Sequence, residues 1–139
     1  MQVKRIILIV LLIGIAAFNQ GCVVAAVGVG AAGTIAYVRG DLEAVESHSL
    51  DNVYEATLKA LEELELNVIS KSKDALTATV NARDAQDKKV KITLKKTAEQ
   101  STKISIRIGT FGDETKSRLI YQKIDYNLLK QQDDMEATS

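Results

Sequence analysis

Proline and tryptophan are absent from this chain of 139 residues, which has one cysteine and one histidine. A single cysteine cannot form a disulfide within the chain, so the fold must be held together by packing alone. The lone histidine, His48, cannot by itself build a metal site or a Ser-His-Asp arrangement, and we expect it in a solvated loop. No serine or threonine has a histidine base placed with it. These absences predict a protein that binds no cofactor or metal and is not an enzyme.

An excess of one charge is also missing, because 18 basic side chains balance 18 acidic ones. If residues 1–21 are removed as a signal peptide, Lys4 and Arg5 are lost, and 16 basic and 18 acidic residues remain. A mature charge near −2 argues against nucleic acid as a partner. The remaining 118 residues are enough for one domain with a core and too few for two.

The N-terminus has the pattern of a bacterial secretory signal. Two basic residues precede an apolar run of 13 residues from Ile6 to Phe18. A helix of that length covers about 20 Å, too short for a hydrocarbon core of about 30 Å. Cys22 follows Gly21 at the end of the run, where a lipoprotein signal peptidase would cut. We predict that residues 1–21 are a lipoprotein signal peptide and that Cys22 carries the lipid that anchors the protein to the membrane.

A second interpretation stays open. Asn19 and Gln20 occupy places that an apolar and a small residue take in the usual lipoprotein signal. The chain is also almost wholly apolar from Gly21 to Val38, so residues 6–28 could form one uncleaved membrane helix. Residues 22–33 are a small-residue tether in the first interpretation, whereas in the second their small side chains mediate oligomerisation in the bilayer. Because valine rather than aspartate follows the cysteine, lipidation predicts the outer membrane, with the domain facing the periplasm.

Residues 34–130 have the pattern of one folded domain. Two segments show apolar residues at three- and four-residue spacing behind a capping residue: Ser49 or Asp51 to about Glu65, and Asp113 to about Leu129. Five segments alternate between apolar and polar residues: 35–46, 68–72, 76–83, 89–95 and 103–109. The resulting order is βαββββα. It predicts an α+β fold, a two-layer sandwich in which an antiparallel sheet of about five strands carries two helices on one face. Residues 131–139 read as a disordered tail.

The same patterns give expectations at single positions. In the first strand Gly40 marks a bulge, and Ala36 and Val38 share one side with Leu42 and Ala44. Asn67 ends the first helix. Leu76 in the third strand and Leu119 in the last helix point inward, toward the core.

Four segments resemble a known family. They are the run YVRGDLEAVE, the helix YEATLKALEELELNV, the segment KDALTATVNARDAQDKKVKITLKK and, most specifically, IRIGTFGDETKSRLI. Together they are similar to the small bacterial lipoproteins of the family numbered 3568 among the domains of unknown function. The resemblance extends from Cys22 to Leu129. It implies a secreted, lipid-anchored protein of Gram-negative type, and it implies no activity.

One face of the predicted sheet is a candidate binding surface. If the apolar residues point at the helices, parity places six basic residues on the opposite face: Arg83, Lys89, Lys91, Lys95, Lys103 and Arg107. By the same parity we expect no acidic residue there. Residues 76–109 have a net charge of +5 and residues 41–66 a net charge of −7, so the domain is expected to be a dipole. One interpretation is that these charges serve only solubility and block edge pairing. The functional interpretation is that they bind an anionic envelope component or an acidic protein, which includes a second copy of this chain.

The turn from Phe111 to Glu114 places two neighbouring carboxylates at the start of the last helix. Paired carboxylates could hold a cation. We expect instead that they cap the helix, because carboxylates there accept hydrogen bonds from free N–H groups, and that Arg107 and Arg118 form ion pairs with them.

Overall fold

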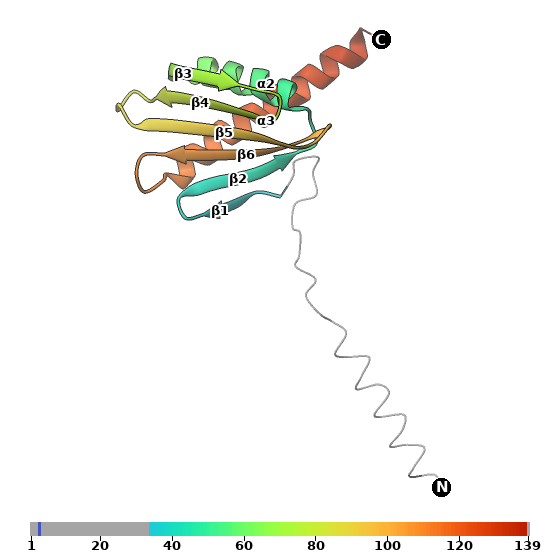
Figure 1. The fold of residues 1–139 in the computed structure, drawn as a ribbon, viewed down its shortest axis with the longest axis horizontal. Helices are drawn as coiled ribbons and strands as arrows, with labels where there is room; N and C mark the ends of the chain where they lie inside the picture. Colours follow the sequence, from blue (N-terminus) through green and yellow to red (C-terminus); the bar gives the residue numbers. More distant parts are fainter. Residues whose placement is uncertain (1–2, 4–33, 139) are drawn as a thin grey trace.

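The computed structural model describes residue 3 and residues 34–138. In that part of the chain six strands form one antiparallel sheet, and two helices lie against one side of it (Figure 1). In chain order the elements are β1 (Ala36–Val38), β2 (Asp41–Glu46), α2 (Leu50–Glu63), β3 (Asn67–Lys73), β4 (Thr77–Arg83), β5 (Lys89–Ala98), β6 (Ser101–Ile108) and α3 (Glu114–Ala137). Across the sheet the order is β1-β2-β6-β5-β4-β3. The predicted α+β fold is confirmed, with one strand more than expected.

The additional strand arises because residues 35–46 fold back on themselves instead of forming one bulged strand. Arg39 and Gly40 have φ angles of 53° and 88°. Two successive residues with positive φ are what a tight two-residue hairpin turn requires. Gly40 is therefore a turn residue and not a bulge, and β1 and β2 are the two arms of a hairpin.

This hairpin changes which residues of β1 face the core. Tyr37 pairs with Leu42, so these two side chains lie on the same side of the sheet, and Tyr37 packs against the core. Ala36 and Val38 are exposed. Their expected place beside Leu42 was wrong, because a turn shifts the alternation of side chains relative to one continuous strand.

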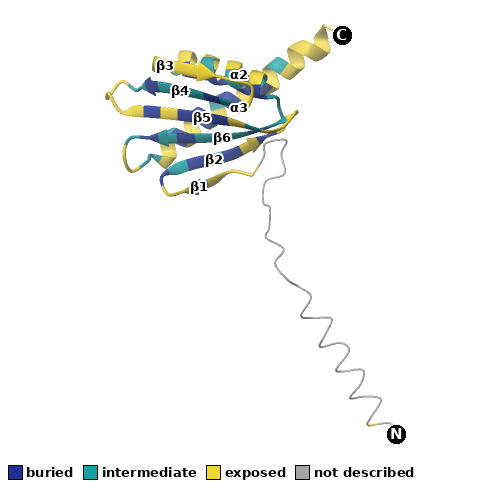
Figure 2. Ribbon diagram, in the orientation of Figure 1, coloured by how far each residue is buried: buried dark blue, intermediate teal, exposed yellow. Residues whose placement is uncertain are grey.

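The core fills the space between the sheet and the helices. Figure 2 shows buried and less buried residues alternating along the central strands β2, β6, β5 and β4, as the period of two predicts. Every residue of the edge strand β3 is exposed. Both helices pack against the sheet and against each other, and α2 presents the small residues Ala56 and Ala60 to the core.

The first helix begins and ends through local backbone chemistry. Ser49 is its N-cap, and the Ser49 hydroxyl accepts a hydrogen bond from the backbone N–H of Asn52 at 3.3 Å. The helix ends at Glu63 with Leu64 as its C-cap. Glu65 then takes a φ of 55°, and the N–H of Leu66 bonds back to the carbonyl of Leu61 at 2.9 Å. Asn67 is the first residue of β3 and not the end of the helix, because Glu65 adopts the left-handed conformation two residues earlier.

The last helix is longer than expected, and the set of its residues that faces the core differs from the expected one. Residues 131–137, read from the sequence as a disordered tail, continue α3, since they include neither glycine nor proline to stop it. Asp113 is the N-cap as predicted. Leu119 is 54% exposed, because Ser117, Ile120 and Tyr121 occupy the buried side instead. Leu76 lies in the turn before β4 and is also exposed, not inward.

Candidate functional site

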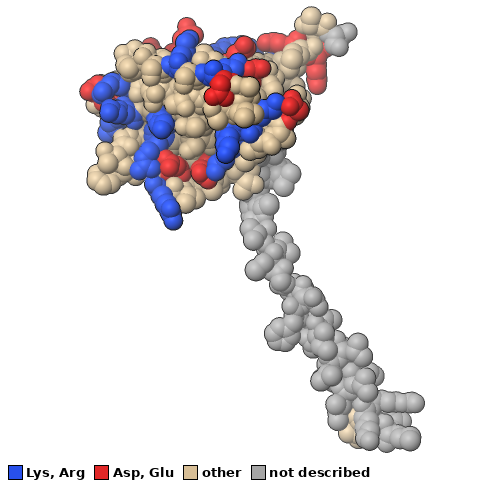
Figure 3. All heavy atoms as spheres, viewed as in Figure 1, with Lys and Arg blue, Asp and Glu red and all other residues tan. Residues whose placement is uncertain are grey.

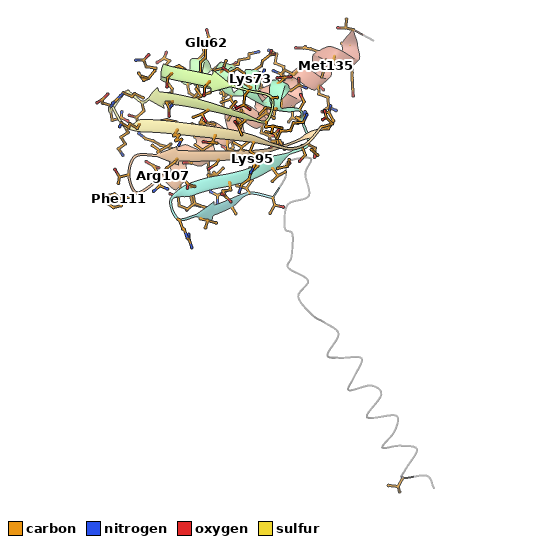
Figure 4. All side chains as sticks on the ribbon, viewed as in Figure 1. Glu62, Lys73, Lys95, Arg107, Phe111 and Met135 are labelled. Carbon is orange, nitrogen blue, oxygen red and sulfur yellow. The ribbon has the colours of Figure 1, made fainter. Side chains whose placement is uncertain are left out.

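The side of the sheet that carries no helix is called the outer face here. Its side chains come from alternate positions of the strands, and both helices pack on the other side. All six basic residues expected there lie on it: Arg83 at the end of β4, Lys89, Lys91 and Lys95 on β5, and Lys103 and Arg107 on β6. Figure 4 shows Lys95 and Arg107 near opposite ends of this sheet, on neighbouring strands.

Acidic residues share the outer face, contrary to expectation. Asp41 and Glu43 of β2 lie beside β6, where an Asp41 carboxylate oxygen is 3.1 Å from Arg107 Nη1 and a Glu43 oxygen is 3.0 Å from Lys103 Nζ. Figure 3 shows acidic side chains between basic ones on this side of the molecule. The expectation failed because it considered only residues 76–109, whereas the sheet pairs β6 with a strand from the acidic segment.

The three lysines of β5 on the outer face have no such partners. Lys89, Lys91 and Lys95 form no ion pair with any residue that the structure describes. Each lies directly opposite another basic residue on a neighbouring strand: Lys89 opposite Arg83, Lys91 opposite Arg107 and Lys95 opposite Lys103. Like charges directly opposite one another destabilise a sheet. The three facing cations each have a carboxylate partner, Asp87 for Arg83, Asp41 for Arg107 and Glu43 for Lys103, which reduces this cost. The repulsion that remains falls on Lys89, Lys91 and Lys95.

Part of the outer face is concave. A hollow of about 380 Å³ lies over β4, β5 and β6, and we call it the basic hollow. Four of its lining residues are basic, namely Arg83, Lys89, Lys91 and Arg107. The others are Ile69, Asn81, Ala82, Val90 and Gly109. No carboxylate lines it. A concave surface with several cations and no anion is suited to a ligand with a negatively charged group.

Arg107 is the most constrained of these cations. Besides Asp41, its guanidinium donates to the carbonyl oxygen of Arg39 at 3.2 Å and to that of Thr110 at 2.8 Å. These bonds tie the β1–β2 turn to the loop after β6. Arg107 therefore has a structural task at the rim of the basic hollow, while Lys89 and Lys91 are free to meet a ligand.

The chain also has a buried carboxylate that sequence reasoning missed. Glu46 at the end of β2 is 1% exposed and accepts a hydrogen bond from the hydroxyl of Tyr121 on α3. Burial raises the pKa of Glu46, against the Tyr121 bond that lowers it, and the charge of Asp125 raises it further. The sequence did contain an indication that Glu46 is buried, because in the alternating strand it has the same parity as the buried Leu42 and Ala44.

The other candidate residues from the sequence form contacts within the fold. His48 is half-buried in the loop before α2, and its carbonyl oxygen accepts a hydrogen bond from the Thr102 hydroxyl at 2.9 Å. Glu114 forms an ion pair with Arg118 at 2.8 Å, as expected. Arg107 does not join them, because Asp41 lies nearer on the adjacent strand. No group of three or more potential metal ligands occurs among the residues that the structure describes.

The predicted lipidation site cannot be placed in this way. Cys22, the tether and the alternative membrane helix over residues 6–28 lie outside the described residues, as does the signal peptide apart from residue 3. Within residues 34–138 and at residue 3, no helix combines the length and apolar character needed to cross a bilayer.

Comparison with known proteins agrees with the resemblance stated above. Residues 5–127 match the sequence profile of a family described as "Protein of unknown function (DUF3568)". No curated protein matches the chain. The matched stretch includes both arms of the first hairpin, all of α2, the whole four-stranded meander and the first half of α3. Because it covers most of the sequence, the chain belongs to the DUF3568 family.

Proposed function

We propose that this protein is a lipid-anchored lipoprotein of the bacterial envelope with a binding role and no catalytic one. Cys22 carries the lipid, and the domain from residue 34 onward faces the periplasm from the outer membrane. The outer face of the sheet binds an anionic envelope component or an acidic protein surface. The N-terminal apolar run before a single cysteine supports the anchor, and the arrangement of cations on β5 supports the anionic partner.

One observation carries the binding part of this proposal. Lys89, Lys91 and Lys95 are each held opposite a second cation, and none has a carboxylate partner within the described chain. A surface needed only for solubility has no reason to place like charges directly opposite one another, because mixed signs serve solubility as well. An external anion would relieve this repulsion, since Asp41 and Glu43 already pair with Arg107 and Lys103 and leave the three lysines without a negative partner.

Binding is tested with the full chain in neutral nanodiscs. We expect it to sediment with phosphatidylglycerol vesicles at low salt, not with phosphatidylcholine vesicles, and to be released steeply as salt rises. Lys91→Glu with Lys95→Glu should abolish binding without unfolding the domain, because both side chains are exposed. Lys59→Glu with Lys130→Glu makes the same charge change on the helices and should bind as the original does. Equal loss in both double variants would mean that only net charge matters.

The anchor has its own test. Metabolic labelling with a palmitate analogue should label the protein in its native bacterium, and Cys22→Ala should remove the label. The mass of the mature protein, extracted from membranes, should lack residues 1–21. A mature chain that keeps residues 1–21 and has no label would overturn the anchor, and it would favour the uncleaved membrane helix.

A further inference from the structure

Phe111 is the most exposed large hydrophobic residue among those the structure describes, at 91%. It lies in the loop between β6 and α3, at the end of the sheet that also carries the β1–β2 turn (Figure 4). Leaving a phenyl ring in water is unfavourable by roughly 2 kcal/mol relative to burying it. A single exposed apolar residue in a flexible loop needs no explanation, so the rigidity of the loop decides whether Phe111 is of interest.

The loop is fixed by close contacts between backbones. Gly40 and Gly112 have φ angles of 88° and 85° and lie against each other so closely that a Cβ on Gly112 would be 2.3 Å from the carbonyl oxygen of Gly40. Arg107 joins the two loops from the side through its bonds to the carbonyls of Arg39 and Thr110. Phe111 is therefore presented outward by a prearranged loop, which lowers the entropy lost when the ring is bound.

A pocket at the same end of the sheet is suited to such a ring. It measures about 240 Å³, and we call it the apolar pocket. Its apolar lining comes from the end of α2, from β5 and β6 and from the first turns of α3: Leu64, Leu66, Val90, Ile108, Leu119 and Ile120. Asp84, Gln86 and Lys116 also line it, and Lys116 bonds to both of the others. An engineered cavity of about 150 Å³ with an apolar lining is known to bind benzene. The apolar pocket is therefore large enough for a phenyl side chain.

Charges beside the two features are complementary. Arg39 lies in the turn that packs against the Phe111 loop, and Glu65 lines the apolar pocket. Neither side chain forms an ion pair with a described residue, and both are exposed. A partner that binds Phe111 and places a carboxylate beside it would also form an ion pair with Arg39. A second copy of this chain provides both the apolar pocket and the carboxylate, which is that of Glu65.

We propose that two copies of this chain associate through their loop ends, with Phe111 of each copy seated in the apolar pocket of the other. Arg39 of one copy then meets Glu65 of the second. Because each copy gives one ring and receives one, the contact closes on itself as a two-fold dimer. The outer face takes no part, so this inference goes beyond the proposed anion binding and does not depend on it.

The test uses the full chain in its native membrane, with the photoreactive amino acid p-benzoylphenylalanine in place of Phe111. Irradiation should yield a product of twice the mass, with the cross-link mapped to the peptide that contains Leu119. Leu119→Glu should abolish the product, and this change should leave the fold intact because Leu119 is half exposed. The same probe at Leu76, which is 62% exposed at the other end of the sheet, is the matched control and should give no such product.

A second measurement separates docking from proximity in the membrane. In neutral detergent, Phe111→Ala should raise the dimer dissociation constant about thirtyfold or more, as expected for a central aromatic anchor. Arg39→Glu and Glu65→Arg should each weaken the dimer, and their combination should restore it. A cross-link only to lipid or to another protein, or a dimer that survives both Phe111→Ala and Leu119→Glu, would overturn the proposal. Lys91→Glu with Lys95→Glu should leave the dimer unchanged, which keeps this result separate from anion binding.

Discussion

The hydroxyl of Tyr121 on α3 donates a hydrogen bond to the carboxylate of Glu46 at the end of β2, and both side chains are buried. The bond joins residues 75 positions apart and connects the last helix to the sheet. Burial is the main cause of the raised pKa of Glu46, and burial also raises the pKa of Tyr121, so the phenol keeps its proton. Glu46 is thus a group whose negative charge opposes folding.

The first prediction is that Glu46→Gln stabilises the protein at neutral pH. The folded state holds the Glu46 proton more tightly than the unfolded chain does, so the free energy of unfolding falls as pH rises from about 4.5 through the raised pKa. Glutamine cannot ionise and can still accept the Tyr121 bond. We expect the variant to be more stable than the original protein at pH 7 and to lose this advantage near pH 4. Urea unfolding across this range measures both.

Asp125→Asn should act in the same direction, because burial raises the pKa of Asp125 as well, against the lowering effect of His48. If the free energies of unfolding of Glu46→Gln and of the original protein differ by the same amount at every pH, Glu46 does not have a raised pKa. Below about pH 4 the original protein should lose stability instead, because the pKa of Asp84 is lowered, first by its bond from Lys116.

The second prediction concerns Tyr121, which donates the hydrogen bond to Glu46. Tyr121→Phe removes the hydroxyl and leaves the Glu46 carboxylate buried without its partner, which should cost about 1 to 3 kcal/mol at pH 7. The cost should shrink in acid, because the protonated form of Glu46 no longer carries the charge that needs the bond. In the Glu46→Gln background the same change should cost less, and a double-mutant cycle at pH 7 measures the difference.

The sheet and its caps could be predicted from local sequence. Strict alternation from Leu76 to Gly109 determines which residues can face a core, and short side chains with an oxygen, Ser49 and Asp113, stand where helices begin. These features depend on residues a few positions apart. For the same reason the six cations were correctly placed on one face.

What the sequence did not reveal depends on distant contacts. The turn at Arg39 and Gly40 requires positive φ at arginine, which no local rule favours, and it is held by the loop around Phe111 some 70 residues later. The acidic partners of Arg107 and Lys103 could not be foreseen either, because they follow from the pairing of β2 with β6. Long-range pairing of this kind leaves no periodic pattern in either strand.

The third prediction addresses the end of α3. Residues 132–138 are all exposed, so a chain that stops after Lys130 should unfold within about 0.5 kcal/mol of the full chain while its helical circular dichroism decreases. Leu128→Ala is the contrasting change one turn earlier. Its side chain is 1% exposed, and its loss should cost about 2 to 5 kcal/mol. A truncated chain that is as unstable as Leu128→Ala would mean that the last turns pack against something.

The fourth prediction tests whether the like-charge pairs on the outer face oppose folding. Lys95→Thr should stabilise the protein by about 0.5 kcal/mol at low salt, because it removes the repulsion from Lys103 and adds a residue that favours strands. The gain should fade as salt rises. Lys103→Thr removes the same repulsion but also the ion pair with Glu43, so it should give no comparable gain. Equal gains from both changes would mean that the Glu43 pair contributes nothing.

The last prediction separates backbone strain from steric contact in the loop that presents Phe111. Gly109 and Gly112 both have positive φ, 65° and 85°. A Cβ on Gly109 would have no atom within 4 Å, so Gly109→Ala should cost only the strain of the left-handed conformation, about 1 kcal/mol. A Cβ on Gly112 would lie 2.3 Å from the Gly40 carbonyl oxygen and 2.4 Å from the Tyr37 hydroxyl, and the backbone cannot give way without opening the loop.

Gly112→Ala should therefore cost clearly more than Gly109→Ala, about 3 kcal/mol or more in urea unfolding. It should also speed amide hydrogen exchange in the β1–β2 turn, which Gly112 contacts, while Gly109→Ala should not. If the two variants unfold at the same urea concentration, the close packing of Gly40 against Gly112 does not hold the loop. The rigid presentation of Phe111, on which the proposed dimer depends, would then lack its support.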